Sequence, residues 1–165
     1  MRAIQVFRFG DPSVMQVNDL PVPAVGPGEV RVEIKAAGVN PVDTYIRSGN
    51  YPTDLSLPYT PGMDGSGIVK QLGEGVSEFT EGERVYIVAA PFGTYAQEMV
   101  CPKNVVVPLP DNISFAQGAA IGIPYATAWR ALFSKAQAVA RETVLVHGAS
   151  GGVGTAAVQL AKMLA

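Results

Sequence analysis

Apolar and polar positions alternate along most of the first hundred residues of this chain. In the stretch EVRVEIKAAGV, Val30, Val32 and Ile34 fall on one side of an extended backbone, and the charged residues Arg31, Glu33 and Lys35 fall on the other. A period of two residues is typical of a strand with one buried face in an antiparallel sheet. Comparable runs, separated by Gly- and Pro-containing turns, are AIQVFRF, GSGIVKQLG, RVYIVAA, GTYAQEMV and NVVVPLP. The pattern predicts a compact β domain.

The pattern becomes helical near Asp111. Ser114 to Gln117 fits a capping box, in which the Ser hydroxyl and the Gln amide satisfy free backbone groups at a helix start. The Ala-rich stretch AQGAAIGIPYATAWRALFS follows, and Pro124 is expected to break or kink its helix into two pieces. In the second piece, three residues are expected to share a buried face: Ala128, Ala131 and Leu132.

The last part of the sequence predicts a strand, a turn and a helix. The apolar run TVLVHG predicts the strand, and GGVGTAAVQLAKMLA predicts the helix. Four apolar residues of that helix recur at helical spacing: Val153, Ala157, Leu160 and Leu164.

The turn between them, residues 149–154, reads A-x-G-x-x-G, a version of the dinucleotide-binding fingerprint. Its glycines serve tight turning, close approach of the backbone to a pyrophosphate, and close packing of helix on strand. The phosphates would lie at the helix N-terminus, where free N–H groups favour an anion. An ordinary Gly-rich turn that binds nothing is the alternative. The residue that reads the ribose comes about twenty residues later, which is beyond Ala165.

Composition and charge narrow the function. Apolar residues make up 48% and charged residues 16% of the 165 residues, a globular balance. The formal charge is −2 and the basic residues are scattered, so nucleic-acid binding is not predicted. The single cysteine excludes an intrachain disulfide. Neither a secretory signal nor a membrane span is recognisable, and the expected location is the cytoplasm.

Four motifs in order resemble the medium-chain dehydrogenase/reductase superfamily, and within it the NADPH:quinone oxidoreductases of the zeta-crystallin type. They are GVNPVDTYIRSGNYP, LPYTPGMDGSGIV, QGAAIGIPYATAWRAL and VLVHGASGGVG. The resemblance implies a mainly β fold with some α: a GroES-like β-barrel domain over residues 1–125, then an incomplete Rossmann strand–helix stub over 126–165. It also implies a truncated form, because family members continue through a complete six-stranded nucleotide-binding sheet.

The resemblance further implies cofactor and site residues. Zinc-dependent relatives carry Cys where Asn40 stands and His-Glu within the segment PGMDG, so no metal site is expected. The implied cofactor is NADPH and the implied substrate a quinone. Tyr45, Asn40 and Asp43 match positions at the nicotinamide and substrate, and Tyr45 and Thr127 also match positions near the cofactor. The pyrophosphate loop matches Ser150, Gly151, Gly152, Val153 and Gly154.

Several of these residues have a plainer interpretation. Without the family, Tyr45 reads as a half-buried aromatic and Asn40, before Pro41, as a turn residue. His147 is expected to pack or hydrogen-bond beneath the glycine turn, and Cys101 to be inert core. Arg141 stands where this branch commonly has Gly, which affects only the local turn.

Three functions follow as hypotheses. The first is the N-terminal portion of a zinc-independent NADPH:quinone oxidoreductase, weakly active or inactive as an isolated chain. The second is a non-catalytic short isoform or fragment that acts as a binding or oligomerisation module, since relatives form homo-oligomers. The third is RNA binding, known in some zeta-crystallin relatives, but the sequence offers no basic groove for it.

Overall fold

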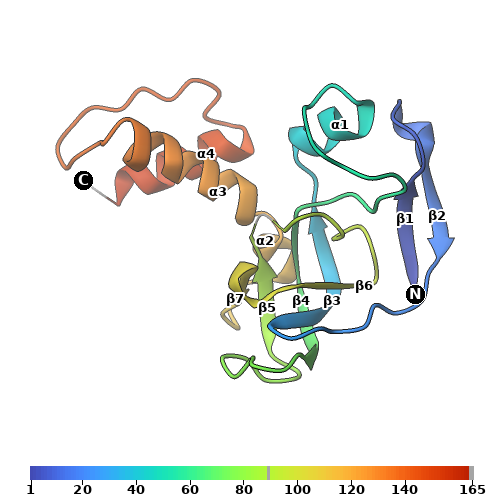
Figure 1. Cartoon of the computed structure of the whole chain (residues 1–165). Helices are drawn as coiled ribbons and strands as arrows, with labels where there is room; N and C mark the ends of the chain where they lie inside the picture. The colour runs from blue at the N-terminus through green and yellow to red at the C-terminus, as the bar shows by residue number, and fades with distance from the viewer. Residues whose placement is uncertain (89, 164–165) are drawn as a thin grey trace.

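The computed structural model describes residues 1–88 and 90–163, and Figure 1 shows the arrangement of its elements. The strands are β1 (Arg2–Val6), β2 (Met15–Asp19), β3 (Glu29–Gly38), β4 (Asp64–Leu72), β5 (Arg84–Ile87), β6 (Glu98–Pro102) and β7 (Val106–Pro108). The helices are α1 (Pro41–Ser48), α2 (Phe115–Gly118), α3 (Gly122–Trp129) and α4 (Gly152–Lys162). Short 3-10 turns cover Pro12–Val14 and Lys103–Val105, and a π-helical turn, Arg130–Lys135, continues α3.

The strands within the described residues pair antiparallel, as the alternation predicts. One sheet has the order β6-β3-β4-β5-β7, and β1 pairs with β2 in a second, two-stranded sheet. Single bridges, Ala3 with Ala96 and Val6 with Tyr59, join β1 to the rest. The predicted mainly β fold is therefore confirmed, with observed strands shorter than several of the apolar runs that predict them.

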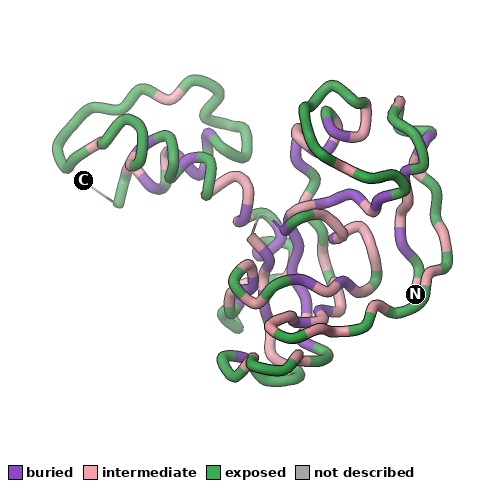
Figure 2. Tube along the Cα trace, viewed as in Figure 1, coloured by how far each residue is buried: buried purple, intermediate pink, exposed green. Residues whose placement is uncertain are grey.

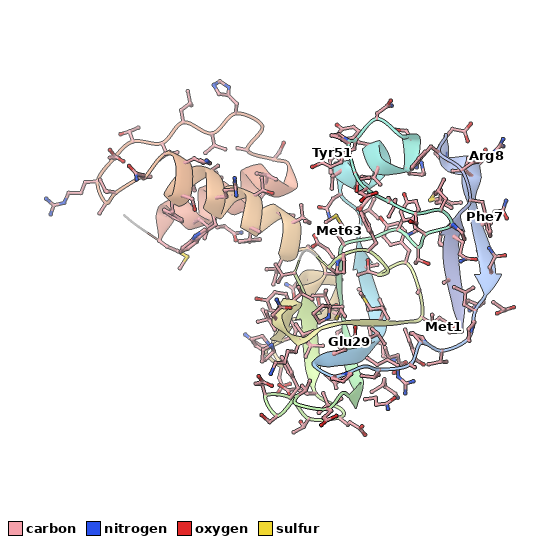
Figure 3. The ribbon with its side chains drawn as sticks, in the orientation of Figure 1. Met1, Phe7, Arg8, Glu29, Tyr51 and Met63 are labelled. Atoms are coloured by element: carbon pink, nitrogen blue, oxygen red, sulfur yellow. The ribbon has the colours of Figure 1, made fainter. Side chains whose placement is uncertain are left out.

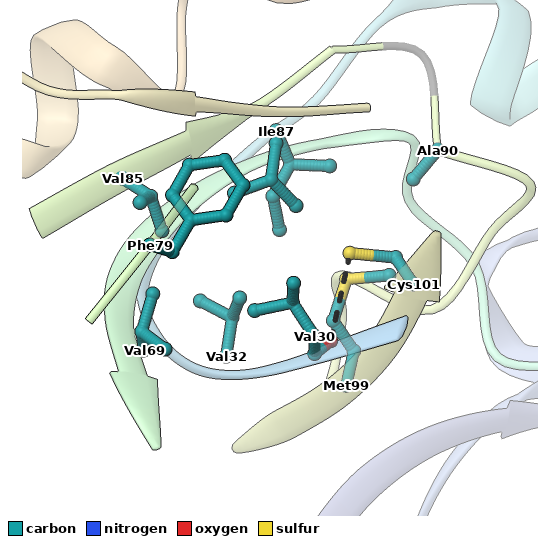
Figure 4. Packing of buried hydrophobic residues seen from close by; sticks show 10 residues of the cluster. Val30, Val32, Val69, Phe79, Val85, Ile87, Ala90, Met99 and Cys101 are labelled. Carbon is teal, nitrogen blue, oxygen red and sulfur yellow. Dashed lines mark hydrogen bonds between the residues drawn. The ribbon is translucent and has the colours of Figure 1, made fainter. Parts of the chain in front are cut away.

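The main core lies on one face of the larger sheet. Val30 and Val32 of β3 are fully buried and Ile34 packs against the same cluster, which confirms the predicted face (Figure 4). Cys101 also belongs to this core, as predicted, and its Sγ lies 3.9 Å from the carbonyl oxygen of Val30. Burial raises the pKa of the Cys101 thiol to about 12, which keeps it in the unreactive thiol form.

The helical part begins as the sequence predicts. The Ser114 hydroxyl accepts the N–H of Gln117 at 3.2 Å, and the Gln117 side chain accepts the N–H of Ser114 at 2.9 Å. The predicted interruption is also present, because α2 ends at Gly118 and α3 begins at Gly122. Pro124 lies in the first turn of α3, where a missing N–H costs no helical hydrogen bond.

Helices α3 and α4 pack on one another through a small separate core made of Ala128, Leu132, Ala156, Ala157 and Leu160. One predicted member of this face is wrong. Ala131 is exposed, since the backbone passes from α to π geometry at Arg130 and the side-chain phase shifts there. Helix α4 is present, as its apolar spacing predicts, and Val153 in its first turn is exposed. Leu164 lies outside the described residues.

The predicted strand at TVLVHG is also wrong. Residues 142–146 have no strand geometry, and Leu145 is 81% exposed. A strand needs a neighbour to pair its backbone groups, and none of the described strands lies beside this segment. Figure 2 shows the loop that leads to α4 as almost wholly exposed, although Val146 packs against the core between α3 and α4.

Arg141, at the start of this loop, adopts a left-handed backbone with φ of 71°. That conformation strains any residue with a Cβ and favours glycine. We expect Arg141→Gly to raise the free energy of unfolding by about 0.5–1 kcal/mol, the relief of strain exceeding the entropy that glycine adds to the unfolded chain. Arg141→Ala removes the same charge but keeps the strain, and its denaturation midpoint should match the parent. Equal stabilisation by both variants would show that charge, and not backbone geometry, is responsible.

Candidate functional site

Helix α1 was not expected from the sequence, and it places three of the candidate residues. Asn40 is its N-cap, not a plain turn residue, and Pro41 is its first residue. Gly49 ends the helix in the left-handed region, with φ of 79°. These are standard start and stop signals, but only Val42 and Ile46 supply an apolar helical period. The signal that could have found the helix is the combination of Asn40, Pro41 and Asp43.

Asp43 is a buried carboxylate in the first turn of α1. Its Oδ2 accepts the backbone N–H of Asn40 at 2.8 Å, which supports the helix start, and the Tyr95 hydroxyl lies 3.4 Å from the same oxygen. Burial raises the pKa of Asp43, and the hydrogen bonds from Asn40 and Tyr95 oppose that rise. Burial and the neighbouring Asp43 charge raise the pKa of Tyr95, so this phenol stays protonated.

Asp64 is a buried carboxylate that no sequence motif identified as a site residue. It begins β4, and its Oδ2 accepts the Asn40 side-chain N–H at 2.9 Å. Both carboxylate oxygens lie 2.9 Å from the backbone nitrogen of Ile123, at the start of α3. An acidic residue at the head of an apolar strand was a visible signal, but its partners are 24 and 59 residues away in sequence.

The glycine turn precedes α4 as the fingerprint predicts. The Gly151 N–H donates to the Gly148 carbonyl at 3.0 Å, and the Thr155 N–H donates to the Gly151 carbonyl at 2.8 Å. The amides of residues 152–154 therefore belong to the first turn, where N–H groups have no intrahelical acceptor. A Cβ at Gly154 would overlap the backbone of Gly148 and Ala149, so this glycine is what allows helix and turn to approach.

A cavity of about 560 Å³ separates the β body, by which we mean strands β1 to β7 together with α1, from the glycine turn. The β body contributes Gly38, Val39, Asn40, Pro41 and Asp64 to its lining. The segment between α2 and α3 and the start of α3 contribute Ala119, Ala120 and Pro124. The turn and α4 contribute Val146, His147, Gly148, Gly151, Gly152, Val153, Gly154 and Ala157.

The structure thus brings some predicted residues together and leaves others apart. Asn40 and Gly151 to Gly154 line the one cavity, and Ser150 is exposed within the same turn. Tyr45 is 53% exposed on α1 and Thr127 is exposed on α3, both outside the lining. Asp43 is buried outside the lining and accepts the Asn40 backbone N–H. The predicted packing role of His147 is wrong: its side chain is exposed at the cavity wall, because the segment that carries it lies on the surface instead of within a sheet.

The lining residues contain no lysine or arginine. An anion held at the turn would therefore depend on backbone N–H groups and on the positive end of α4. In residues 1–88 and 90–163, no three His, Cys, Asp or Glu side chains come together in a way that could hold a metal ion. Nor does any helix in these ranges combine the length and apolarity needed to cross a bilayer.

The fold and the cavity define a mainly β domain whose α1 edge faces a glycine turn. The chain belongs to the alcohol dehydrogenase GroES-like domain family, whose model matches residues 26–111. This confirms the predicted GroES-like fold.

Similarity to individual proteins extends beyond that domain. The chain is 52% identical over 163 residues to a quinone oxidoreductase of Rattus norvegicus, which covers 98% of this chain and 50% of the relative. An Escherichia coli quinone oxidoreductase solved in complex with NADPH superposes with a TM-score of 0.88 at 37% identity, over 99% of this chain and 50% of the other. A human synaptic vesicle membrane protein VAT-1 homolog-like protein superposes with a TM-score of 0.94 at 34% identity, over 99% of this chain and 53% of the other.

These matches confirm the resemblance to quinone oxidoreductases of the medium-chain dehydrogenase/reductase superfamily. The chain spans about half the length of the curated relatives it matches.

Proposed function

We propose that this chain is the N-terminal portion of a zinc-independent NADPH:quinone oxidoreductase, and that it works in the cytoplasm. One observation carries the proposal: Asn40 of the β body and the glycine turn face each other across a single cavity. The residues that line the cavity come from both halves of the family pattern, the GVNPVD motif and the GASGGVG motif.

The residues present fit the phosphate end of such a nucleotide. The amides of residues 152–154 begin α4, and Gly151 and Gly152 present no side chain to the cavity they line. The close approach at Gly154 keeps the turn tight against the helix, as a pyrophosphate cradle requires. The nicotinamide supplies the reducing equivalents when bound, and the protein supplies orientation and an enclosed site.

The remaining candidates have positions compatible with the opposite end of the site. Asn40 offers a side-chain amide at the cavity wall, and Asp43, in the first turn of α1, accepts the Asn40 backbone N–H and so supports the helix start. Tyr45 is exposed one turn further along α1, and Thr127 is exposed on α3. We propose that Tyr45 and Asn40 border the nicotinamide and the quinone, and that Thr127 approaches the cofactor from α3.

Binding and turnover test this proposal separately. In calorimetric titration, the chain should bind NADPH, and the Gly154→Ala variant should not. With 9,10-phenanthrenequinone as acceptor, we expect little or no NADPH oxidation, because half of the length of the relatives lies outside this chain. Absence of any NADPH binding would contradict the proposed function, and robust turnover would contradict the expectation that this portion is insufficient for catalysis.

A specific surface favours the second function, a binding or oligomerisation module. Apolar side chains are exposed along the loop before α4 and at the end of that helix, most of all Val139, Leu145 and Met163. Such a patch can associate with a second copy or with a longer homologous subunit. Size-exclusion chromatography with light scattering distinguishes the cases: a dimer that Leu145→Lys converts to a monomer supports the module, and a monomer at all concentrations contradicts it.

A further inference from the structure

The buried carboxylate of Asp64 occupies the junction of three elements. Only 1% of the residue is exposed, and it contributes to the floor of the cavity. It lies at the first position of β4, accepts the Asn40 side-chain N–H, and accepts the Ile123 backbone N–H with both oxygens. Met63, directly before it in sequence, is seen in Figure 3 below α1, on the side of the β body nearer to α3.

Each of these bonds ends on a different wall of the cavity. Asn40 is the N-cap of α1, so its bond holds the α1 wall. Ile123 is in the first turn of α3, where its N–H has no intrahelical acceptor and where a negative charge is favoured. Helix α3 in turn packs on α4 through Ala128 and Ala156, and α4 carries the glycine turn. A hydrogen-bonded and packed path therefore runs from Asn40 through Asp64 to the turn.

Two glycines allow the carboxylate to reach its partners. A Cβ on Gly122 would overlap Asp64 Oδ1, and a Cβ on Gly38 would come within 3.0 Å of the Asp64 Cβ and overlap the Ala119 carbonyl oxygen. The β body and the start of α3 thus approach each other as closely as glycine permits. The junction is built tightly around this side chain.

We propose that Asp64 is a positioning residue, which fixes the Asn40 amide and the glycine turn at one separation across the cavity. As a direct consequence, Asp64 also fixes the orientation of the α3–α4 pair on the β body. A fixed separation would help the protein to contact both ends of a dinucleotide at the same time, and this part of the inference rests on the proposed function.

Orientation can be measured without any ligand. In the isotope-labelled chain, residual dipolar couplings from the β sheet and from α3–α4 should fit one common alignment tensor. In Asp64→Asn an NH2 group replaces one of the two accepting oxygens and faces the Asn40 side-chain N–H or the Ile123 N–H, donor against donor, and the two sets should require different tensors. Asp43→Asn is the matched control, because it is also a buried carboxylate bonded to Asn40 but has no bond to α3. A common tensor in Asp64→Asn, or separate tensors in Asp43→Asn, would overturn the proposal.

The pair Asn40→Asp with Asp64→Asn restores one donor and one acceptor between the two side chains. It should recover the common tensor, even where Asp64→Asn alone does not fold. A paired variant that stays unfolded or keeps two tensors would contradict a positioning role.

Ligand selectivity separates positioning from general stability. Asp64→Asn should weaken NADPH about tenfold, the loss expected for a misplaced hydrogen-bonding group, while 2′,5′-ADP, which lacks the nicotinamide half, should bind within about twofold of the parent. Equal weakening of both ligands, or of neither, would overturn the positioning role. If the parent chain binds no NADPH at all, the proposed function fails, and the dipolar couplings still decide the role of Asp64 in orientation.

Discussion

The Gly154→Ala variant is expected to lose about 1–3 kcal/mol of unfolding free energy, the usual cost of forcing a group into a packed site. Alanine inside a helix normally gains about 1 kcal/mol over glycine, so the expected change has the opposite sign. The reason is geometric: the added Cβ would overlap the Gly148 carbonyl oxygen and lie only 2.7 Å from the Ala149 Cα. Both are backbone atoms, so the turn itself has to move away from α4.

Movement of the turn should also abolish binding at the first turn of α4. Gly152→Ala is the matched control, two residues earlier on the same helix, where the new Cβ would meet Pro124 at an ordinary 3.5 Å. We expect that variant to keep its stability, so it is a control for stability alone, because residue 152 lines the cavity in which the nucleotide is proposed to bind. Chemical denaturation of the two variants compares their stability, and calorimetric titration of Gly154→Ala measures the loss of binding. Equal stability of the pair would show that close approach at residue 154 is not what shapes the turn.

The second large effect is expected in the core of the main sheet. Val32→Ala should cost about 2–3 kcal/mol, the transfer free energy of the removed methyl groups plus the cavity they leave. Val32 is 0% exposed on β3, between β4 and β6, and it touches a cluster that includes Val69 and Met99. That loss is a large part of the stability of a domain of this size.

Val17→Ala provides the control for Val32→Ala. It is the same substitution in a strand, but Val17 is 66% exposed on β2. Its effect should stay within about 0.5 kcal/mol. Urea denaturation of both variants measures the difference. A comparable loss at Val17 would mean that β propensity, and not burial, explains the destabilisation at Val32.

The β body could be predicted because, within each strand, the alternation of apolar and polar residues shows which face is buried. Alternation identifies Val30, Val32 and Ile34 correctly, since a one-residue slip would turn all three to solvent. The capping box at Ser114 could be predicted for a similar reason, because both partners lie within four residues of each other.

What the sequence does not predict depends on partners distant in the chain. Residues 142–146 have the composition of a strand, yet no described strand pairs with them, so composition alone misleads. Asp64 joins Asn40 and Ile123, and no local pattern records either contact. The sequence did not predict helix α1 for another reason. Its Asn-Pro start also suits a turn, and its apolar stripe consists of only two residues.

The candidate site was predictable in its two motifs but not in their relation. The glycine fingerprint locates the turn and the family resemblance locates Asn40, while their meeting across one cavity follows from the packing of α3 on α4. Tyr45 and Thr127 came from the resemblance alone, and both side chains are exposed outside that cavity. Their roles remain predictions.

Nuclear magnetic resonance titration of the isotope-labelled chain with NADPH is the most direct measurement of where a nucleotide sits. We expect saturable shifts at the backbone amides of Gly151, Gly152 and Gly154 together with the side-chain amide of Asn40, and smaller shifts at the sheet face that carries Val32. With 2′,5′-ADP, the glycine amides should shift and the Asn40 amide should not. Shifts confined to another surface, or glycine amides unmoved while NADPH binds, would contradict this expectation.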